Sequence, residues 1–139
     1  MNYFIGTKIV QATPEQREDK EGYKVVYEND YVSWSPKEVF EKAYLPVIEN
    51  QNMKTKIAIS QEMVDNFIAI KHVSTIGEKT TLVRVALVNG FEIIESSSCV
   101  DKENYSKEMG ERICMEKIED KIWMLLGFLL QTAYSGVKK

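Results

Sequence analysis

The pattern of hydrophobic and polar residues is clearest between residues 80 and 99. Residues 80–88 and 91–99 are rich in β-branched side chains, and Asn89-Gly90 stands between them. Two such stretches joined by Asn-Gly predict a β-hairpin with a type I′ turn, because that turn needs a positive φ at both central residues. The second half of the chain is therefore predicted to contain an antiparallel sheet.

A two-residue turn also predicts which residues of the hairpin lie opposite one another. Counting outward from the turn pairs Val88 with Phe91 and places Arg84 directly opposite Glu95. Because side chains alternate between the two faces of a sheet, one face is predicted to carry Leu82, Arg84, Ala86, Val88, Phe91, Ile93 and Glu95. The other face is predicted to carry Val83, Val85, Leu87 and Ile94.

A helical pattern follows the hairpin and reaches Leu130, with Asp101 or Asn104 as its N-cap. Its apolar residues recur at spacings of three and four, at Met109, Ile113, Cys114, Ile118, Ile122, Leu125, Leu126, Leu129 and Leu130. Such a face needs a sheet beneath it, so we expect this helix to cover the hairpin and a preceding strand at residues 67–76. A short helix is predicted just before that strand, at residues 60–66.

The first 47 residues carry a separate set of short elements. Residues 3–12, 23–27 and 31–34 have the composition of strands. The sequence Ser-Pro-Lys-Glu at residues 35–38 places serine at an N-cap, proline at the first helical position and glutamate three residues after the cap. It predicts a helix that ends by Tyr44.

These elements together predict an α+β fold in two parts. Residues 1–47 would form a small N-terminal β module with one short helix, and residues 48–56, which lack periodicity, would form a linker. Residues 57–139 would form an antiparallel three-stranded meander packed against a long C-terminal helix, as the domain that binds a ligand.

Composition limits the partners that the chain can take. With 44% hydrophobic residues the chain can bury a core, and its formal net charge of −3 favours neither a DNA or RNA polymer nor an anionic membrane. The longest apolar run, at residues 122–130, is about half the length that a bilayer requires. Cys99 and Cys114 have no disulfide or zinc spacing, so we predict reduced thiols in a cytoplasmic protein.

No pattern in the sequence points to catalysis or to a metal. His72 is the only histidine, so a histidine-based triad lacks evident partners and a zinc site lacks its ligand spacing. The Ser-Ser-Ser-Cys sequence at residues 96–99 has no Gly-x-Ser-x-Gly motif around it, and its ordinary role is to satisfy backbone groups at a strand end. We predict no catalytic residue, no metal and no cofactor.

One group of residues has the chemistry of a binding site. Arg84, Asn89 and Phe91 gather at one end of the hairpin, and Arg112 lies with Lys117 and Lys121 on the helix that follows. A guanidinium, an amide and an aromatic plane are the groups that recognise the phosphate, ribose and base of a small nucleotide. The alternative is structural, with Arg84 paired to Glu95, Phe91 in the core and Asn89 serving the turn. The residues alone leave both interpretations open.

Several linked motifs extend through residues 68–131. They are Asn89-Gly-Phe-Glu92, Glu95-Ser-Ser-Ser-Cys-Val-Asp101, Asn104-Tyr105, Gly110–Cys114, Lys121-Ile-Trp123 and Gly127–Leu130. Together they resemble a family of small phage and prophage proteins founded on early proteins of phages N4 and Sf6. The first 47 residues, with the run Trp34-Ser-Pro-Lys-Glu-Val-Phe-Glu-Lys-Ala-Tyr44, resemble a separate phage module found in front of several counter-defence proteins.

The second half is also similar to the Thoeris anti-defence proteins of the first type. Those proteins are phage sponges that bind cyclic ADP-ribose isomers, and in some cases cyclic oligonucleotides, without degrading them. The resemblance implies a phage anti-defence protein that is not an enzyme and that sequesters a cyclic nucleotide immune signal in the host cytoplasm as a homo-oligomer. Arg84, Asn89, Phe91 and Arg112 are its expected ligand-binding residues on chemical grounds, and they are not transferred from that family.

Two other functions stay open. The aromatic residues and the acidic loop of the first 47 residues are suited to binding and inhibiting a host protein. A small hydrolase that uses a serine or the cysteine of residues 96–99 is the other alternative.

Overall fold

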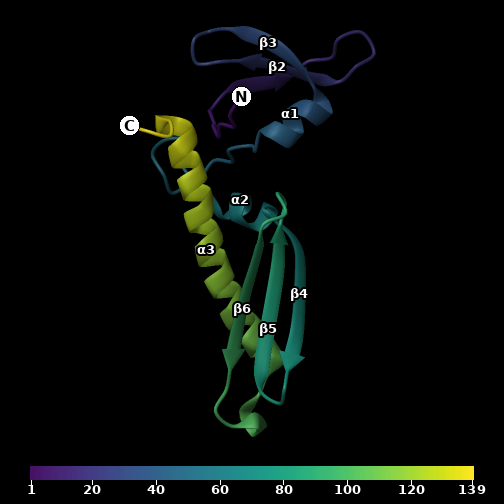
Figure 1. Cartoon of the computed structure of the whole chain (residues 1–139), viewed down its shortest axis with the longest axis vertical. Coiled ribbons are helices and arrows are strands. Elements are labelled where there is room, and N and C mark those ends of the chain that lie inside the picture. Colours follow the sequence, from purple (N-terminus) through teal and green to yellow (C-terminus); the bar gives the residue numbers. More distant parts are fainter. The chain divides into compact units, whose positions relative to one another are not determined.

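The computed structural model describes all 139 residues, and its contacts divide the chain into two compact units. The first unit comprises Met1–Val47 and Phe128–Lys139, and the second comprises Ile48–Gly127. Each unit contains one three-stranded antiparallel sheet, and helices accompany both sheets (Figure 1). The fold is therefore α+β, as predicted. The linker at 48–56 and the domain at 57–139 stay predictions.

The first unit contains a sheet in the order β1-β2-β3 and one short helix. Its elements are β1 (Gln11–Pro14), β2 (Gly22–Val26), β3 (Val32–Pro36) and α1 (Lys37–Ala43). α1 packs against the sheet through aromatic rings, with the ring centroids of Tyr23 and Phe40 4.3 Å apart. Val25 is the fully buried side chain at the centre of this small core.

Two predictions for the first unit are wrong. Residues 1–10 form no strand, because β2 ends at a turn closed by the bond from Tyr27 N to Tyr31 O and offers earlier residues no partner. Ser35 does not cap α1, because it is paired within β3 and its hydroxyl donates to the Pro36 carbonyl instead. α1 begins at Lys37 without a side-chain cap.

The second unit contains the predicted meander and the start of the long helix. Its elements are α2 (Gln61–Asn66), β4 (Ile68–Ile76), β5 (Thr80–Leu87), β6 (Glu92–Ser98), the 3₁₀ helix η1 (Lys102–Asn104) and α3 (Lys107–Ser135). The strand order is β4-β5-β6, and α3 runs along one face of this sheet (Figure 1). The short helix predicted at residues 60–66 is present as α2, and Ser60 caps it by accepting a hydrogen bond from Met63 N at 3.4 Å.

The core of the second unit lies between the sheet, α2 and α3. Side chains of α3 enter it at intervals of four residues, at Gly110, Cys114, Ile118, Ile122 and Leu126. They meet β-strand residues Val83, Val85, Leu87 and Ile93, and α2 adds Met63 and Val64. The predicted buried positions Met109 and Ile113 are instead exposed. Asp101 caps η1, and Ser106 accepts the bond from Met109 N at the start of α3, so the predicted cap is wrong.

The hairpin turn is one residue longer than predicted. Leu87 N donates to Phe91 O at 2.8 Å, and Gly90 N donates to Leu87 O at 2.8 Å, so Val88, Asn89 and Gly90 form a three-residue loop. Gly90 has a φ of 89°, whereas Asn89 is not among the residues with positive φ, which excludes a type I′ turn. Three-residue loops with glycine in the left-handed conformation are a common alternative for hairpins.

The longer turn shifts the register by one residue. Val85 lies opposite Ile93 and Arg84 opposite Ile94, where the two-residue turn had predicted Arg84 opposite Glu95. A slip of one residue exchanges the two faces of a strand. Ile93 is accordingly buried against α3 and Ile94 is exposed, the reverse of the predicted grouping.

Candidate functional site

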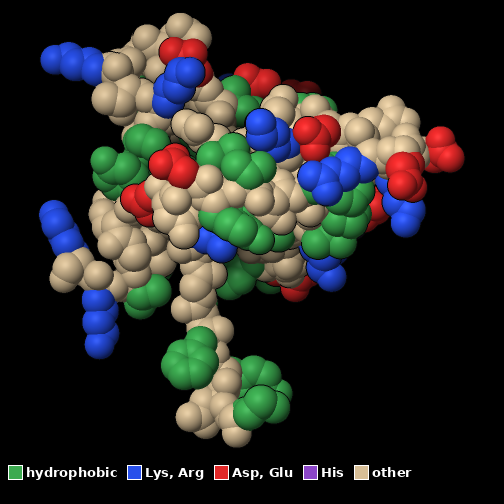
Figure 2. Space-filling view, turned by 90° about the horizontal axis from the view of Figure 1, so that it is seen from above, with side chains coloured by type: hydrophobic (Ala, Val, Ile, Leu, Met, Phe, Trp, Pro, Cys, Tyr) green, Lys and Arg blue, Asp and Glu red, His purple; other side chains and the backbone are tan.

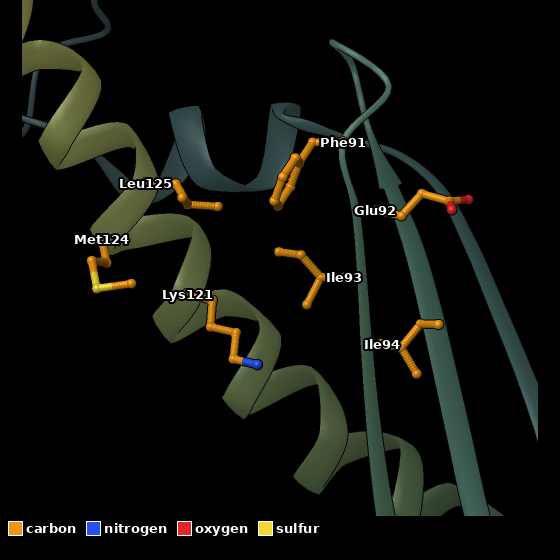
Figure 3. Close-up of a pocket in the computed structure, with 7 residues that line it drawn as sticks. All are labelled: Phe91, Glu92, Ile93, Ile94, Lys121, Met124 and Leu125. Carbon is orange, nitrogen blue, oxygen red and sulfur yellow. The ribbon is translucent and has the colours of Figure 1, made fainter.

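A groove of about 350 Å³ lies in the second unit between β6 and α3. Its walls are Phe91, Glu92, Ile93, Ile94, Lys121, Met124 and Leu125. Figure 3 shows Phe91 and Ile93 turned toward α3, and Glu92 and Ile94 turned to the opposite side of β6. Most of these side chains are apolar, and Lys121 supplies the positive charge. The volume is near the lower end for small-molecule sites, which span about 300 to 1,000 Å³.

Phe91 presents its ring at the open end of this groove. The residue is 54% exposed, and no other aromatic ring stacks on it. Asn89 holds the start of the strand, because its Oδ1 accepts a hydrogen bond from Phe91 N at 3.0 Å. The amide oxygen of Asn89 therefore serves the turn, and its amide NH₂ group is the part left for a ligand.

Two lysines of α3 extend the groove along β6. Lys121 Nζ lies 2.5 Å from Glu95 Oε1, and the Glu95 side chain is only 18% exposed. Lys117 Nζ donates to the Ser96 carbonyl at 3.3 Å and has no carboxylate within ion-pair distance. One helical turn separates the two lysines, so their ammonium groups form a short cationic row beside the strand.

Arg84 lies outside the groove. Its neighbours in β5, Val83 and Val85, are buried toward α3, so the Arg84 side chain is on the other face of the sheet. There its Nη1 lies 2.7 Å from Glu92 Oε1. The predicted pairing of Arg84 with Glu95 is wrong because the register places these residues on opposite faces.

Arg112 lies on a different flank of α3. It is two helical turns from Glu119 and so shares its flank. Glu119 accepts a hydrogen bond from Gln61 of α2, whereas Lys117 and Lys121 reach β6. The structure thus brings Asn89 and Phe91 together and leaves Arg84 and Arg112 apart from them.

Lys121 and Met124 line the groove. Lys121 belonged to the predicted cationic group on the helix without being an expected ligand-binding residue, and Met124 was not predicted. Both residues belong to the predicted long helix, and a spacing of three residues places their side chains near one another on its surface. Which flank of the helix meets β6 depends on how α3 lies on the sheet. That information is absent from the helical periodicity alone.

The matched region of a known protein family contains this entire groove. The family model described as phage protein (N4 Gp49/phage Sf6 gene 66) family matches residues 59–134, more than half of the chain. The chain belongs to this family. No curated protein and no solved structure matches the chain.

Membership of the N4 Gp49/phage Sf6 gene 66 family makes this a phage protein and confirms the resemblance predicted over residues 68–131. The match begins at residue 59, just before α2, and ends at residue 134 near the end of α3. The resemblance of residues 1–47 to a phage accessory module and the similarity to Thoeris anti-defence proteins stay predictions.

The hydroxyl and thiol groups after β6 in this family member have structural partners. Ser98 Oγ lies 2.7 Å from Thr80 Oγ1, and Cys99 Sγ donates to the Asp101 carbonyl at 3.2 Å. Cys114 is buried in the core, where burial raises the pKa of its thiol and disfavours the thiolate. His72 is exposed on β4, opposite Arg84. These contacts fit the interpretation that the residues stabilise the fold.

No group of three or more histidine, cysteine, aspartate or glutamate side chains is arranged to hold a metal ion. None of the helices combines the length and the apolar character needed to cross a membrane.

Proposed function

We propose that this phage protein binds a cyclic nucleotide immune signal beside Phe91 and sequesters it in the host cytoplasm without cleavage. Cyclic ADP-ribose isomers and cyclic oligonucleotides are the signals that the resemblance to Thoeris anti-defence proteins implies. The accessible ring of Phe91 above a groove bordered by Lys121 is the observation that carries the proposal.

Phe91 provides the face on which a base can stack. Stacking of a base on an aromatic side chain contributes about 1 to 3 kcal/mol and needs no particular base. The apolar side chains of Ile93, Met124 and Leu125, which line the same groove, would exclude water from a base stacked on Phe91. This arrangement favours a planar guest over a flexible one.

Lys121 and Lys117 provide the positive charge for phosphate groups. In the free protein Lys121 is paired with Glu95, so a guest must supply at least one strong negative charge to compete with that carboxylate. Lys117 donates to a backbone carbonyl and has no carboxylate partner, so its ammonium group is available to the guest. A pyrophosphate or phosphodiester group meets this requirement, whereas an uncharged nucleoside does not.

The residues that line the groove also support binding without cleavage. They include no serine, cysteine or histidine, so they supply neither a Ser–His nor a Cys–His pair. Glu92 points to the other side of β6 (Figure 3). A bound signal would therefore lie next to the ring of Phe91 and the ammonium group of Lys121, and away from serine, cysteine and histidine side chains.

The proposal predicts that Phe91→Ala weakens binding of cyclic ADP-ribose isomers by about tenfold to a hundredfold, the loss expected for one stacked base. Lys121→Met should weaken binding as well, because it removes the charge and keeps the apolar stem. Isothermal titration calorimetry with cyclic ADP-ribose isomers and cyclic dinucleotides measures both effects, and chromatography of the recovered ligand shows whether it is intact.

Arg84→Gln and Arg112→Gln are the matched controls, since both side chains lie away from the groove and both were predicted ligand residues. Equal losses for these variants and for Phe91→Ala would place the ligand elsewhere. Absence of binding for every ligand would reject the proposal, and recovery of cleaved ligand would make the protein an enzyme.

A second candidate function is the binding and inhibition of a host protein by the first unit. Its support is an N-terminal segment in which Met1, Tyr3, Phe4 and Ile5 are each at least 91% exposed. Figure 2 shows hydrophobic side chains at the tip of a narrow projection. Capture of a host protein from a bacterial lysate that is lost when Tyr3, Phe4 and Ile5 are all replaced by serine would favour this alternative.

A further inference from the structure

The open edge of β6 carries backbone groups that have no backbone partner in the protein. Leu87 lies opposite Phe91 and donates its N–H group to the Phe91 carbonyl. Hydrogen-bonded pairs alternate along an antiparallel ladder, so the pairs Val85–Ile93 and Val83–Glu95, two and four residues before Leu87 in β5, are also hydrogen-bonded. The intervening residues of β6 therefore direct their N–H and C=O groups away from β5. They are Glu92, Ile94, Ser96 and Ser98.

This edge is only partly protected. Proteins commonly guard an exposed strand edge with lysine, and Lys117 does so at the Ser96 carbonyl. The half of the edge around Glu92 and Ile94 has no such guard, and Ile94 is exposed. A strand could therefore be added to β6 beginning at this end.

The groove beside the edge suits the side chains of an added strand. Alternate side chains of a strand point to the same face, so every second residue of an added segment would face α3. There it would meet the apolar surface of Phe91, Met124 and Leu125, of which Met124 is 66% exposed. Backbone bonds supply affinity and side-chain pockets supply specificity in this mode of peptide recognition.

The unpaired charge of Lys117 indicates that the partner carries an acidic residue. Lys117 has no carboxylate partner and lies seven residues, about 10 Å of helix, before Met124. A strand advances about 3.3 Å per residue, so two to four residues separate the positions opposite Lys117 and Met124. An aspartate or glutamate at that spacing from an apolar residue would complete the ion pair that Lys117 lacks.

A second copy of this chain fits the edge less well than a peptide. Antiparallel pairing of two β6 edges about a two-fold axis perpendicular to the sheet places both α3 helices on the same face. With Ile94 at the two-fold axis, Lys117 beside Ser96 would lie opposite Glu92 of the other copy, whose side chain is turned to the other side of β6 (Figure 3), so Lys117 would gain no carboxylate partner. The homo-oligomer that the resemblance implies would have to use another surface.

We propose that β6 is a docking edge for an extended, acidic and apolar peptide segment of another protein. The segment adds to the sheet as an antiparallel fourth strand, with valine-like side chains in the groove and a carboxylate at Lys117. This inference goes beyond the proposed nucleotide binding and does not depend on it; the two guests would share the groove beside Phe91 and would therefore compete.

The test uses two synthetic peptides with the full-length protein. The first is Asp-Asp-Thr-Val-Thr-Val-Thr-Val, which places its acidic end at Lys117 when it pairs antiparallel to β6, and the second has Lys-Lys at the same end. We expect fluorescence anisotropy to show tighter binding of the acidic peptide. We also expect hydrogen exchange measured by NMR to slow at the amides of Glu92, Ile94, Ser96 and Ser98 in the complex.

The N–H group of Ile94 points away from β5, so Ile94→Pro removes this group without removing a bond to β5. Proline is tolerated at such positions of an edge strand. It should weaken peptide binding at least about fivefold, a loss of the size expected for one or two backbone hydrogen bonds. Ile94→Val keeps the N–H group and should bind as the unaltered protein does. Lys117→Gln should abolish the preference for the acidic peptide, whereas Lys107→Gln should preserve it.

Three results would overturn the inference. They are absence of binding for both peptides at millimolar concentration, unchanged exchange at the four outward amides, and a self-association in sedimentation experiments that Ile94→Pro abolishes. The exchange measurement uses the unaltered protein, so it decides the question even where a variant fails to fold.

Discussion

Replacing Gly110 with alanine is expected to lower the free energy of unfolding of the second unit by about 3 kcal/mol, the upper range for an overpacked core. A Cβ atom at this position would stand 2.0 Å from Thr81 Oγ1 and 2.6 Å from Thr81 Cβ. Thr81 is completely buried, and its hydroxyl lies 3.0 Å from the Tyr105 hydroxyl. The clash can be relieved only by moving α3 away from β5 or by displacing Thr81 and its bond. Urea denaturation followed by circular dichroism measures the loss.

Gly127→Ala is the matched control on the same helix. No atom lies within 4 Å of the Cβ added there, so the substitution should stabilise the helix by about 0.5 to 1 kcal/mol. Combining Gly110→Ala with Thr81→Gly removes the clashing atoms and should recover part of the stability that Gly110→Ala loses. A Gly110→Ala protein as stable as the original would contradict the close approach of α3 to β5.

Gly22→Ala is expected to destabilise the first unit by about 2 to 3 kcal/mol through the same kind of overpacking. The added Cβ would stand 2.4 Å from both the Ser35 carbonyl oxygen and Trp34 Cζ2. The indole ring has little freedom to move, because Trp34 Nε1 donates to the Glu15 carbonyl at 2.8 Å. Displacing the ring would break that bond and separate β2 from β3.

The fluorescence of Trp34 in a Trp123→Phe background reports this change, since Trp123 is the other tryptophan and lies in the second unit. We expect a red-shifted emission and an earlier unfolding midpoint for Gly22→Ala. Gly6→Ala, in the same unit with no atom within 4 Å, should leave both values unchanged. An unaltered Trp34 spectrum in the Gly22→Ala protein would show that the ring can move at little cost.

Local sequence patterns predicted most of the elements but not their register. The short helix α2, the strand before the hairpin and the long amphipathic helix depend on neighbouring residues, and the structure contains all of them. Asn89-Gly90 is compatible with a two-residue or a three-residue loop, and the choice depends on which face of β6 packs best under α3. Burying Ile93 rather than Ile94 is a property of the whole core.

The candidate site was predicted in the same partial way. Phe91 and Asn89 are adjacent in sequence through the turn, so their proximity follows directly. Arg84 and Arg112 depend on the register of β5 and on the rotation of α3 over the sheet, which local patterns do not determine. Lys121 and Met124 occupy the places beside Phe91 for the same reason.

The length of the loop at Val88, Asn89 and Gly90 also constrains which sequence changes this protein can accept. Deleting one residue there would rotate β6 half a turn about its own axis, which would turn Ile93 to solvent and the carboxylate of Glu92 toward the hydrocarbon side of α3. Phe91 would leave the groove in the same step. Loops that differ in length by an odd number of residues in related sequences should therefore be accompanied by an inverted alternation of hydrophobic and charged residues throughout β6.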